Sequence, residues 1–228
     1  RILSSAASDV YKRQGLVVPA AIRSALLPVL GRVRDNPSEH RNELHRATDM
    51  CFGLLPYGLF GGYIIMSVFA PLAFPSAYLD GTHGASAVDV FVILLAGWAF
   101  TLLATPTYTS LMAGHHPWRF TGFIVLVLVA ASLLGYGLVL EGSEEPARKL
   151  YSAAVASSLS AGVLLVLSWW MSGEFDAVQH RKIEWFAVLL GSLVVVVGLF
   201  SGTLLWVFGL PLFWFTKQGW RAIRATSD

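Results

Sequence analysis

The sequence has few charged residues and a single cysteine. Charged side chains make up 13% of its 228 residues, which is about half the share of a typical soluble domain. The one cysteine, Cys51, excludes an internal disulfide and a metal cluster held by several thiolates. The net charge of +2 is too small to indicate nucleic acid as a partner. Because 55% of the residues are hydrophobic, the composition predicts a membrane protein.

Residues 1–14 differ from the rest of the chain because they have no apolar period. Residues 4–14 read SSAASDVYKRQ, which resembles the translation of a transposon-end sequencing adapter in one frame. We therefore expect residues 1–14 to be foreign to the protein and exclude them from fold prediction. On this interpretation, residues 15–228 are the back part of a longer chain.

Residues 15–217 consist mostly of long uncharged runs separated by short polar loops. A helix of about 20 apolar residues crosses the hydrocarbon core of a bilayer. The last run, 185–216, is too long for one crossing, and the Gly-Ser-Gly region at 198–202 permits a turn within it. We therefore predict an all-α fold, a transmembrane helix bundle with seven spans at about 15–31, 51–74, 90–114, 120–140, 150–172, 185–199 and 203–216.

Basic side chains in the loops predict the orientation of this bundle. Lys and Arg accumulate in the short loops on the cytoplasmic side of a membrane. With the last run divided into two spans, alternate loops place ten Lys and Arg residues on one side and two on the other. This asymmetry predicts a multi-pass protein of the cell membrane whose tail, 218–228, lies in the cytoplasm.

The loop 32–49 is the longest polar segment between predicted spans. Pro37 and Ser38 predict that a helix starts there, with Ser38 as its cap. The residues that follow are amphipathic. They form either a solvated connector at the membrane surface or a segment that contacts anionic lipid head groups.

A few polar side chains within the predicted spans are candidates for a substrate cavity. Arg23 stands near the middle of the first span, where a charge either faces a cavity or reaches back to the interface. A cavity-facing arginine can bind a phosphate through its planar fork of donors. Hydroxyl groups along 101–110 either line a path for a polar substrate or form hydrogen bonds between helices. The cavity candidates are Arg23, Tyr57, Thr101, Thr105 and Tyr108.

Six prolines lie inside the predicted spans. Proline frees a backbone carbonyl and kinks a helix, and membrane proteins tolerate such breaks where neighbours or a cavity satisfy the backbone. Pro28, Pro56 and Pro106 are the main predicted kinks. Residues 152–162 are rich in Ala and Ser, with one Gly, and predict a surface for close helix packing.

No arrangement of residues indicates catalysis. His115 and His116 stand together in a short basic turn, and no Asp, Glu or Cys nearby completes a metal site. Asp89 stands at the edge of a span, where we expect water to solvate it. We therefore expect no enzyme activity, no metal and no cofactor.

Three stretches carry a resemblance to a known family. The first has a small-x-x-Pro-x-x-x-Arg phrase at 25–32, then an Arg/Glu-rich loop and a helix that opens with Leu55 and Pro56. The second is TPTYTSLMAG followed by a basic turn, and the third is YSAAVASSLSAGVLLVL. Together they resemble polysaccharide-biosynthesis flippases of the multidrug/oligosaccharidyl-lipid/polysaccharide superfamily. The loop 141–149 departs from that pattern because it lacks the family's Ile-Pro-x-x-Gly phrase.

The resemblance implies the C-terminal lobe of a two-lobe transporter that works by alternating access. Its substrate would be a lipid-linked oligosaccharide or polysaccharide precursor. Its partners would be membrane lipids and the N-terminal lobe of the same chain, with no nucleic acid. Three alternatives stay open: a drug/cation antiporter of the same superfamily, which needs an intramembrane carboxylate; a membrane-embedded glycosyl- or acyltransferase that uses His115 and His116; and a scaffold that transports nothing.

Overall fold

The computed structural model describes residues 18–73, 75–79, 86–114, 117–140, 146–173 and 201. Every regular element in these ranges is a helix, which confirms the predicted all-α class for this part of the chain. The elements are a first helix over 18–32, α2 (Pro37–Ala73), the short α3 (Ser76–Leu79), α4 (Ala87–Ala113), α5 (Pro117–Leu140) and α6 (Pro146–Ser172).

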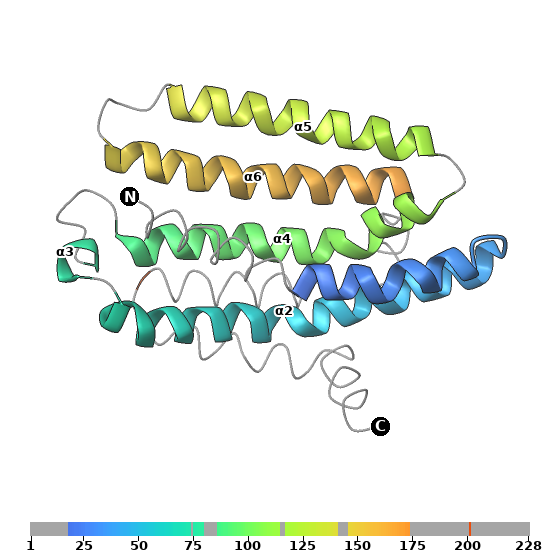
Figure 1. Cartoon of the computed structure of the whole chain (residues 1–228), viewed down its shortest axis with the longest axis horizontal. Coiled ribbons are helices and arrows are strands. Elements are labelled where there is room, and N and C mark those ends of the chain that lie inside the picture. Colours follow the sequence, from blue (N-terminus) through green and yellow to red (C-terminus); the bar gives the residue numbers. More distant parts are fainter. Residues whose placement is uncertain are drawn as a thin grey trace.

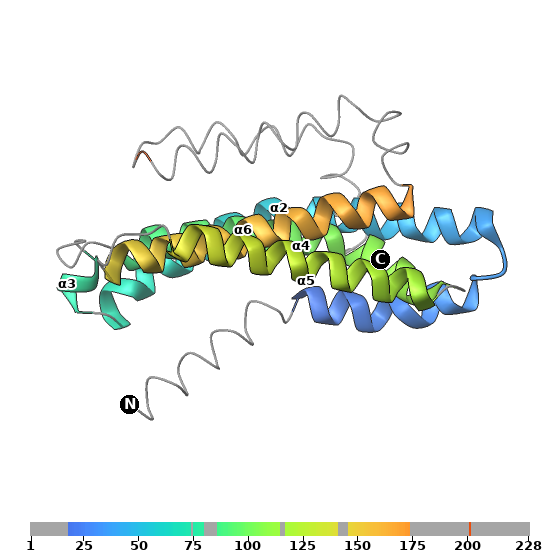
Figure 2. The same cartoon turned by 90° about the horizontal axis from the view of Figure 1, so that it is seen from above.

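Four long helices lie side by side in the order α5, α6, α4 and α2 (Figure 1). The helices α4 and α6 run in the same direction, because Tyr151 meets Asp89 near their beginnings and Ser168 meets Thr107 near their ends. The return helix α5 packs mainly on α6. The helix over 18–32 lies on one face of this layer (Figure 2).

Three helical segments are long and apolar enough to cross a membrane: 87–113 in α4, 118–137 in α5 and 149–172 in α6. They correspond to three of the seven predicted spans and indicate membrane association. The predicted span 51–74 coincides with the second part of α2, and 18–31 of the first predicted span is helical. The predicted spans 185–199 and 203–216 lie outside the described residues, as do residues 1–14 and the tail.

The long helix α2 joins two segments that we predicted to be separate. Its 37 residues correspond to about 55 Å at 1.5 Å per residue, and the helix continues from the polar 37–50 stretch into the apolar one without a break. One face of the polar stretch packs on the bundle, since Leu44 and Thr48 are buried. The loop 32–49 is therefore not only a surface connector. Nothing between positions 38 and 52 interrupts the helix, because Gly and Pro are absent there.

The cap of α2 is also different from our prediction. The side chain of Asn36, not Ser38, lies at the start of the helix: its Oδ1 accepts hydrogen bonds from the Ser38 hydroxyl at 2.9 Å and from the Glu39 amide at 3.5 Å. Glu39 in turn accepts a bond from the Asn36 side-chain amide at 3.2 Å. Pro37 then occupies the first helical position, where its missing N–H costs nothing.

An apolar cluster of buried residues lies between α2 and α4. Cys51, Phe52, Leu55 and Leu59 of α2 pack against Ala99, Leu102 and Leu103 of α4, and Trp169 of α6 borders the cluster. Such burial stabilises a helix pair through close van der Waals packing, which is the main attraction between helices in lipid.

The small-residue stretch 152–162 packs closely on α4, as predicted. Ala154, Ala156 and Ser158 are buried, and the Ser158 hydroxyl donates to the Ile93 carbonyl across the interface at 2.6 Å. Opposite Ser158 stands Gly97, where a Cβ would lie 3.0 Å from the Ser158 Cα atom. Two helix backbones approach this closely only when small residues face each other.

Candidate functional site

Two of the predicted cavity residues, Arg23 in the helix over 18–32 and Tyr108 in α4, contact each other. The Arg23 Nη1 atom donates a hydrogen bond to the Tyr108 hydroxyl at 3.3 Å, although the residues are 85 positions apart in the chain. Arg23 is exposed and Tyr108 is half-buried. The phenol is neutral, and no acidic group among the described residues pairs with Arg23. The contact therefore orients the guanidinium without cancelling its charge.

The predicted hydroxyl track on α4 bonds mostly to its own helix. The Thr101 and Thr105 hydroxyls donate to the carbonyls of Gly97 and Thr101, at 2.9 and 2.8 Å. Thr109 continues the series with a bond to the Thr105 carbonyl at 2.6 Å. Threonine commonly satisfies its hydroxyl in a helix this way. Thr105 is fully buried, so the structure places it in the packed interior and not beside Arg23.

Thr107 forms an interhelical bond, the alternative that we gave for these hydroxyls. Its oxygen lies 2.9 Å from the Ala104 carbonyl oxygen and 2.9 Å from the Ser168 hydroxyl of α6, and its single hydrogen is donated to one of them at a time. Both side chains are fully buried. This pair joins α4 to α6 one position after Pro106.

Pro106 lies inside α4, and the helix continues through it. Figure 1 shows α4 changing direction toward its C-terminal end. A proline loosens the carbonyls of the preceding turn. One of these carbonyls, that of Leu103, accepts a bond from the Trp169 indole of α6 at 3.4 Å. The neighbouring helix therefore supplies a donor at the loosened turn.

The other predicted kink and cavity residues stand as follows. Pro28 is exposed in the helix over 18–32, which continues through it, and α2 likewise continues through position 56. The side chains of Pro56 and Tyr57 lie outside the described part of the structure. His115 and His116 also lie outside it. The described residues contain no group of three or more metal-ligating side chains.

Asp89 is not simply solvated, contrary to our expectation. It stands in the first turn of α4, whose N-terminus is capped by the Ser86 hydroxyl. The Asp89 Oδ2 atom accepts a hydrogen bond from the Tyr151 hydroxyl of α6 at 2.9 Å. Asp89 is the one carboxylate in the three membrane-length segments of the described chain. Sequence reasoning missed its partner because Tyr151 is 62 positions away.

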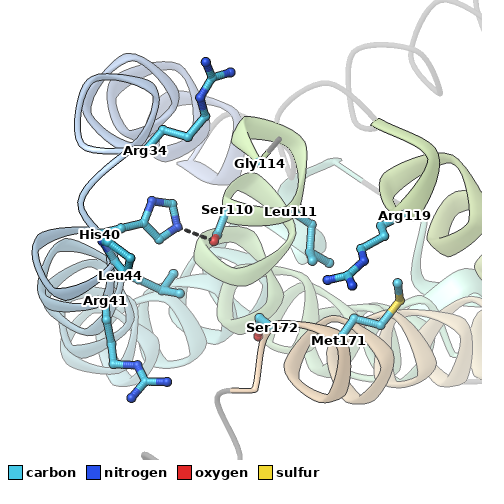
Figure 3. Close-up of a pocket in the computed structure, with 11 residues that line it drawn as sticks. Arg34, His40, Arg41, Leu44, Ser110, Leu111, Gly114, Arg119, Met171 and Ser172 are labelled. Carbon is cyan, nitrogen blue, oxygen red and sulfur yellow. Dashed lines mark hydrogen bonds between the residues drawn. The ribbon is translucent and has the colours of Figure 1, made fainter. Parts of the chain in front are cut away.

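A basic pocket opens at the other end of α4, where α4 and α6 finish and α5 begins (Figure 3). Its volume is about 330 Å³. Three arginines line it, from three different segments: Arg34 in the turn before α2, Arg41 in α2 and Arg119 in α5. No Asp or Glu is among the lining residues that the structure describes. We refer to this site as the basic pocket.

His40 contributes a neutral polar group to the basic pocket. Its Nε2 atom lies 2.8 Å from the Ser110 hydroxyl of α4. Its Nδ1 atom is buried and forms no hydrogen bond of normal geometry with a described residue. Burial lowers the pKa of His40 below its usual value, and the nearby Leu30 carbonyl opposes this only in part. His40 is therefore neutral at physiological pH and joins α2 to α4 without adding charge.

Sequence reasoning placed Arg34, Arg41 and Arg119 on one side of the membrane but did not place them in one pocket. The count of basic residues per loop was the only available signal, and it carries no information about which loops touch. Three comparisons, with protein-family models, with curated proteins and with solved structures, find no match to this chain.

Proposed function

We propose that this chain is the membrane-embedded C-terminal lobe of a transporter that moves a lipid-linked oligosaccharide or polysaccharide precursor across the cell membrane by alternating access. The observation that carries the proposal is the contact between Arg23 and Tyr108. It places a cation on an apolar helix, oriented by a neutral partner on the neighbouring helix. Lipid-linked sugars carry phosphate next to the lipid, and phosphate is the group that such a cation recognises.

The chemistry of arginine supports this role. A guanidinium has five N–H donors in a fixed plane, and the bond to Tyr108 uses one of them. The remaining donors are able to bind a phosphate in a bidentate manner. Arg23 is exposed, so a head group has access to it from the face of the helix layer on which the helix over 18–32 lies.

Pro106, in the turn of α4 next to this contact, supports a bundle whose helices can change their tilt. Pro106 lies two positions before Tyr108, and near it the Leu103 carbonyl of α4 accepts a bond from the Trp169 side chain of α6. A helix bent at a proline is a place where two halves of a bundle can change their relative tilt. The proposal includes seven spans, a cytoplasmic C-terminus and an N-terminal lobe in the same chain, all from the resemblance and the loop charges.

The test is transport by the intact chain in liposomes with a radiolabelled lipid-linked sugar. We expect Arg23→Ala to lower the rate at least about tenfold, since a hydrogen bond to a charged group contributes about 1.5–3 kcal/mol. Arg23→Lys should retain part of the rate, because it keeps the charge but loses the planar fork. Arg46→Gln, an exposed arginine of α2 outside the basic pocket, is the matched control. Unchanged transport by Arg23→Ala would refute the role of this residue.

The contact between Asp89 and Tyr151 favours a second candidate, the drug/cation antiporter. An antiporter needs a carboxylate that binds and releases a proton or cation, and Asp89 lies within a membrane-length segment. The same liposomes separate the two functions. Loss of cation-coupled drug export in Asp89→Asn, together with full activity of Arg23→Ala, would favour the antiporter over the flippase.

A further inference from the structure

We propose that the basic pocket binds the phosphate group of a membrane-surface ligand, at a site separate from Arg23. The proposal does not depend on the transported substrate. Three arginines, from the turn before α2, from α2 and from α5, line a pocket of about 330 Å³, and none of its described lining residues carries a carboxylate. Such an excess of positive charge around a small volume is typical of a site for a compact anion.

The charge of the pocket is not neutralised within the described structure. Arg34, Arg41 and Arg119 form no ion pair with a described residue, and no acidic side chain is among the pocket-lining residues of the described ranges. In Figure 3 the Arg119 guanidinium points inward, toward Leu111 and Met171, whereas Arg34 and Arg41 extend outward from the rim. A phosphate bound next to Arg119 would also lie in the positive field of the two rim arginines.

The pocket lies at the ends of helices that contain membrane-length segments. It lies where α4 ends, α5 begins and α6 ends, and each of these helices contains a segment of membrane-crossing length. Trp118 and Trp170, next in sequence to the pocket residues Arg119 and Met171, are 83% and 67% exposed. Exposed tryptophan at the end of a span is typical of the membrane–water interface.

The lining also has the mixed character that a phospholipid requires. Ser110 and Ser172 provide hydroxyls, and Leu44, Leu111 and Met171 provide an apolar wall. The Ser172 hydroxyl donates to the Trp169 carbonyl at 3.2 Å, so its oxygen can still accept a bond. A volume near 330 Å³ is at the lower end of ligand pockets, which suits a phosphate with its glycerol and excludes a large oligosaccharide.

A phosphate group can come from two sources: the head group of an anionic phospholipid, or a soluble diphosphate such as that released from a lipid-linked sugar. Basic pockets at the ends of transmembrane helices commonly take lipid head groups. The two sources share the chemistry that Arg119 recognises, and they differ in whether an acyl chain is needed for binding.

Native mass spectrometry of the purified full-length chain tests the proposal. The chain is mixed in detergent with phosphatidylglycerol, with phosphatidylcholine or with inorganic pyrophosphate. We expect one phosphatidylglycerol to be retained. Arg119→Gln should weaken its binding about fivefold, and the triple variant with Arg34→Gln and Arg41→Gln about 100-fold. Arg119→Lys should have an intermediate effect, and Arg46→Gln is the control for an exposed α2 arginine outside the pocket.

The outcomes separate the sources and allow refutation. Retention of phosphatidylglycerol alone, weakened by Arg119→Gln, supports the site with a lipid as its ligand. Binding of pyrophosphate with the same dependence on Arg119 supports the site with a soluble diphosphate as its ligand. Binding that is equal in the wild type and the triple variant overturns the proposal, as does the absence of binding to either probe. Thermal unfolding of each variant shows that it is folded.

Discussion

Replacement of Gly97 by alanine tests the close contact between α4 and α6. A Cβ atom at position 97 would lie 2.8 Å from the Ser158 hydroxyl oxygen and 3.0 Å from the Ser158 Cα atom. The hydroxyl can rotate away, but the Cα atom belongs to the backbone of α6. The two helices must therefore move apart by several tenths of an ångström, and the Ser158 bond to Ile93 at 2.6 Å must lengthen.

The expected size of the effect follows from two opposing contributions. Overpacking of a close interface costs about 1–3 kcal/mol, whereas alanine is favoured over glycine inside a helix by about 1 kcal/mol. Gly97→Ala should therefore lower the free energy of unfolding by about 0–2 kcal/mol. Gly135→Ala in α5 is the matched control, because no atom lies within 4 Å of a Cβ at that position. The difference between the two variants isolates the overpacking, about 1–3 kcal/mol.

The assay is equilibrium unfolding of the full-length chain in mixed micelles with increasing SDS, followed by tryptophan fluorescence. Gly97→Val should be less stable than Gly97→Ala, since its Cβ carries two further methyl groups at the same close contact with α6. Equal unfolding midpoints for Gly97→Ala and Gly135→Ala would refute the close approach of α4 and α6 in the membrane.

Two further predictions concern pH and topology. Burial lowers the pKa of His40 below its usual 6.5. As the pH falls below 6.5, His40 is therefore protonated in the unfolded chain before it is protonated in the folded chain. The contribution of His40 to the free energy of unfolding should thus be constant above pH 6.5 and should decrease as the pH falls from 6.5 through the folded-state pKa. In the same unfolding assay, the wild type should lose more stability between pH 7.5 and pH 5.5 than His40→Gln. An equal loss in the two proteins would contradict the prediction. In a Cys51→Ser background, Ser201→Cys and Ser227→Cys should react with a membrane-impermeant maleimide from opposite sides of the membrane. Labelling of both positions from the same side would refute the division of the 185–216 run into two spans.

The polar contacts of α4 divide between packing and recognition. Thr101, Thr105 and Thr109 donate to carbonyls of their own helix, and Thr107 bonds to Ser168. The first three bonds satisfy the hydroxyls within α4, and the Thr107–Ser168 bond between helices contributes about 0.6 kcal/mol in a membrane. In our proposals, recognition of an anion belongs to cations that the described structure leaves without an acidic partner. These are Arg23 beside Tyr108 and the arginines of the basic pocket.

Several properties could be predicted from the sequence because they depend on local composition. Long apolar runs require helices in lipid, since only a helix satisfies its own backbone there, and 90–114, 120–140 and 150–172 are close to the helices observed. The small residues of 152–162 predicted close packing, since the absence of large side chains is itself what permits it. Even so, the cap of α2 was misplaced by two residues, because Asn36 and Ser38 are both good caps and their geometry decides between them.

The sequence by itself therefore determined the all-α class, the membrane-length helices and the candidate cation Arg23. Only the tertiary structure decided that Arg23 meets Tyr108, that Asp89 meets Tyr151, and that three arginines from separate segments share one pocket. The reason is physical: hydropathy and helix period report how each segment relates to its solvent, but they do not say which faces of different helices come together. That choice depends on side-chain shapes across residues separated by 60 or more positions, such as the Thr107–Ser168 pair, 61 apart.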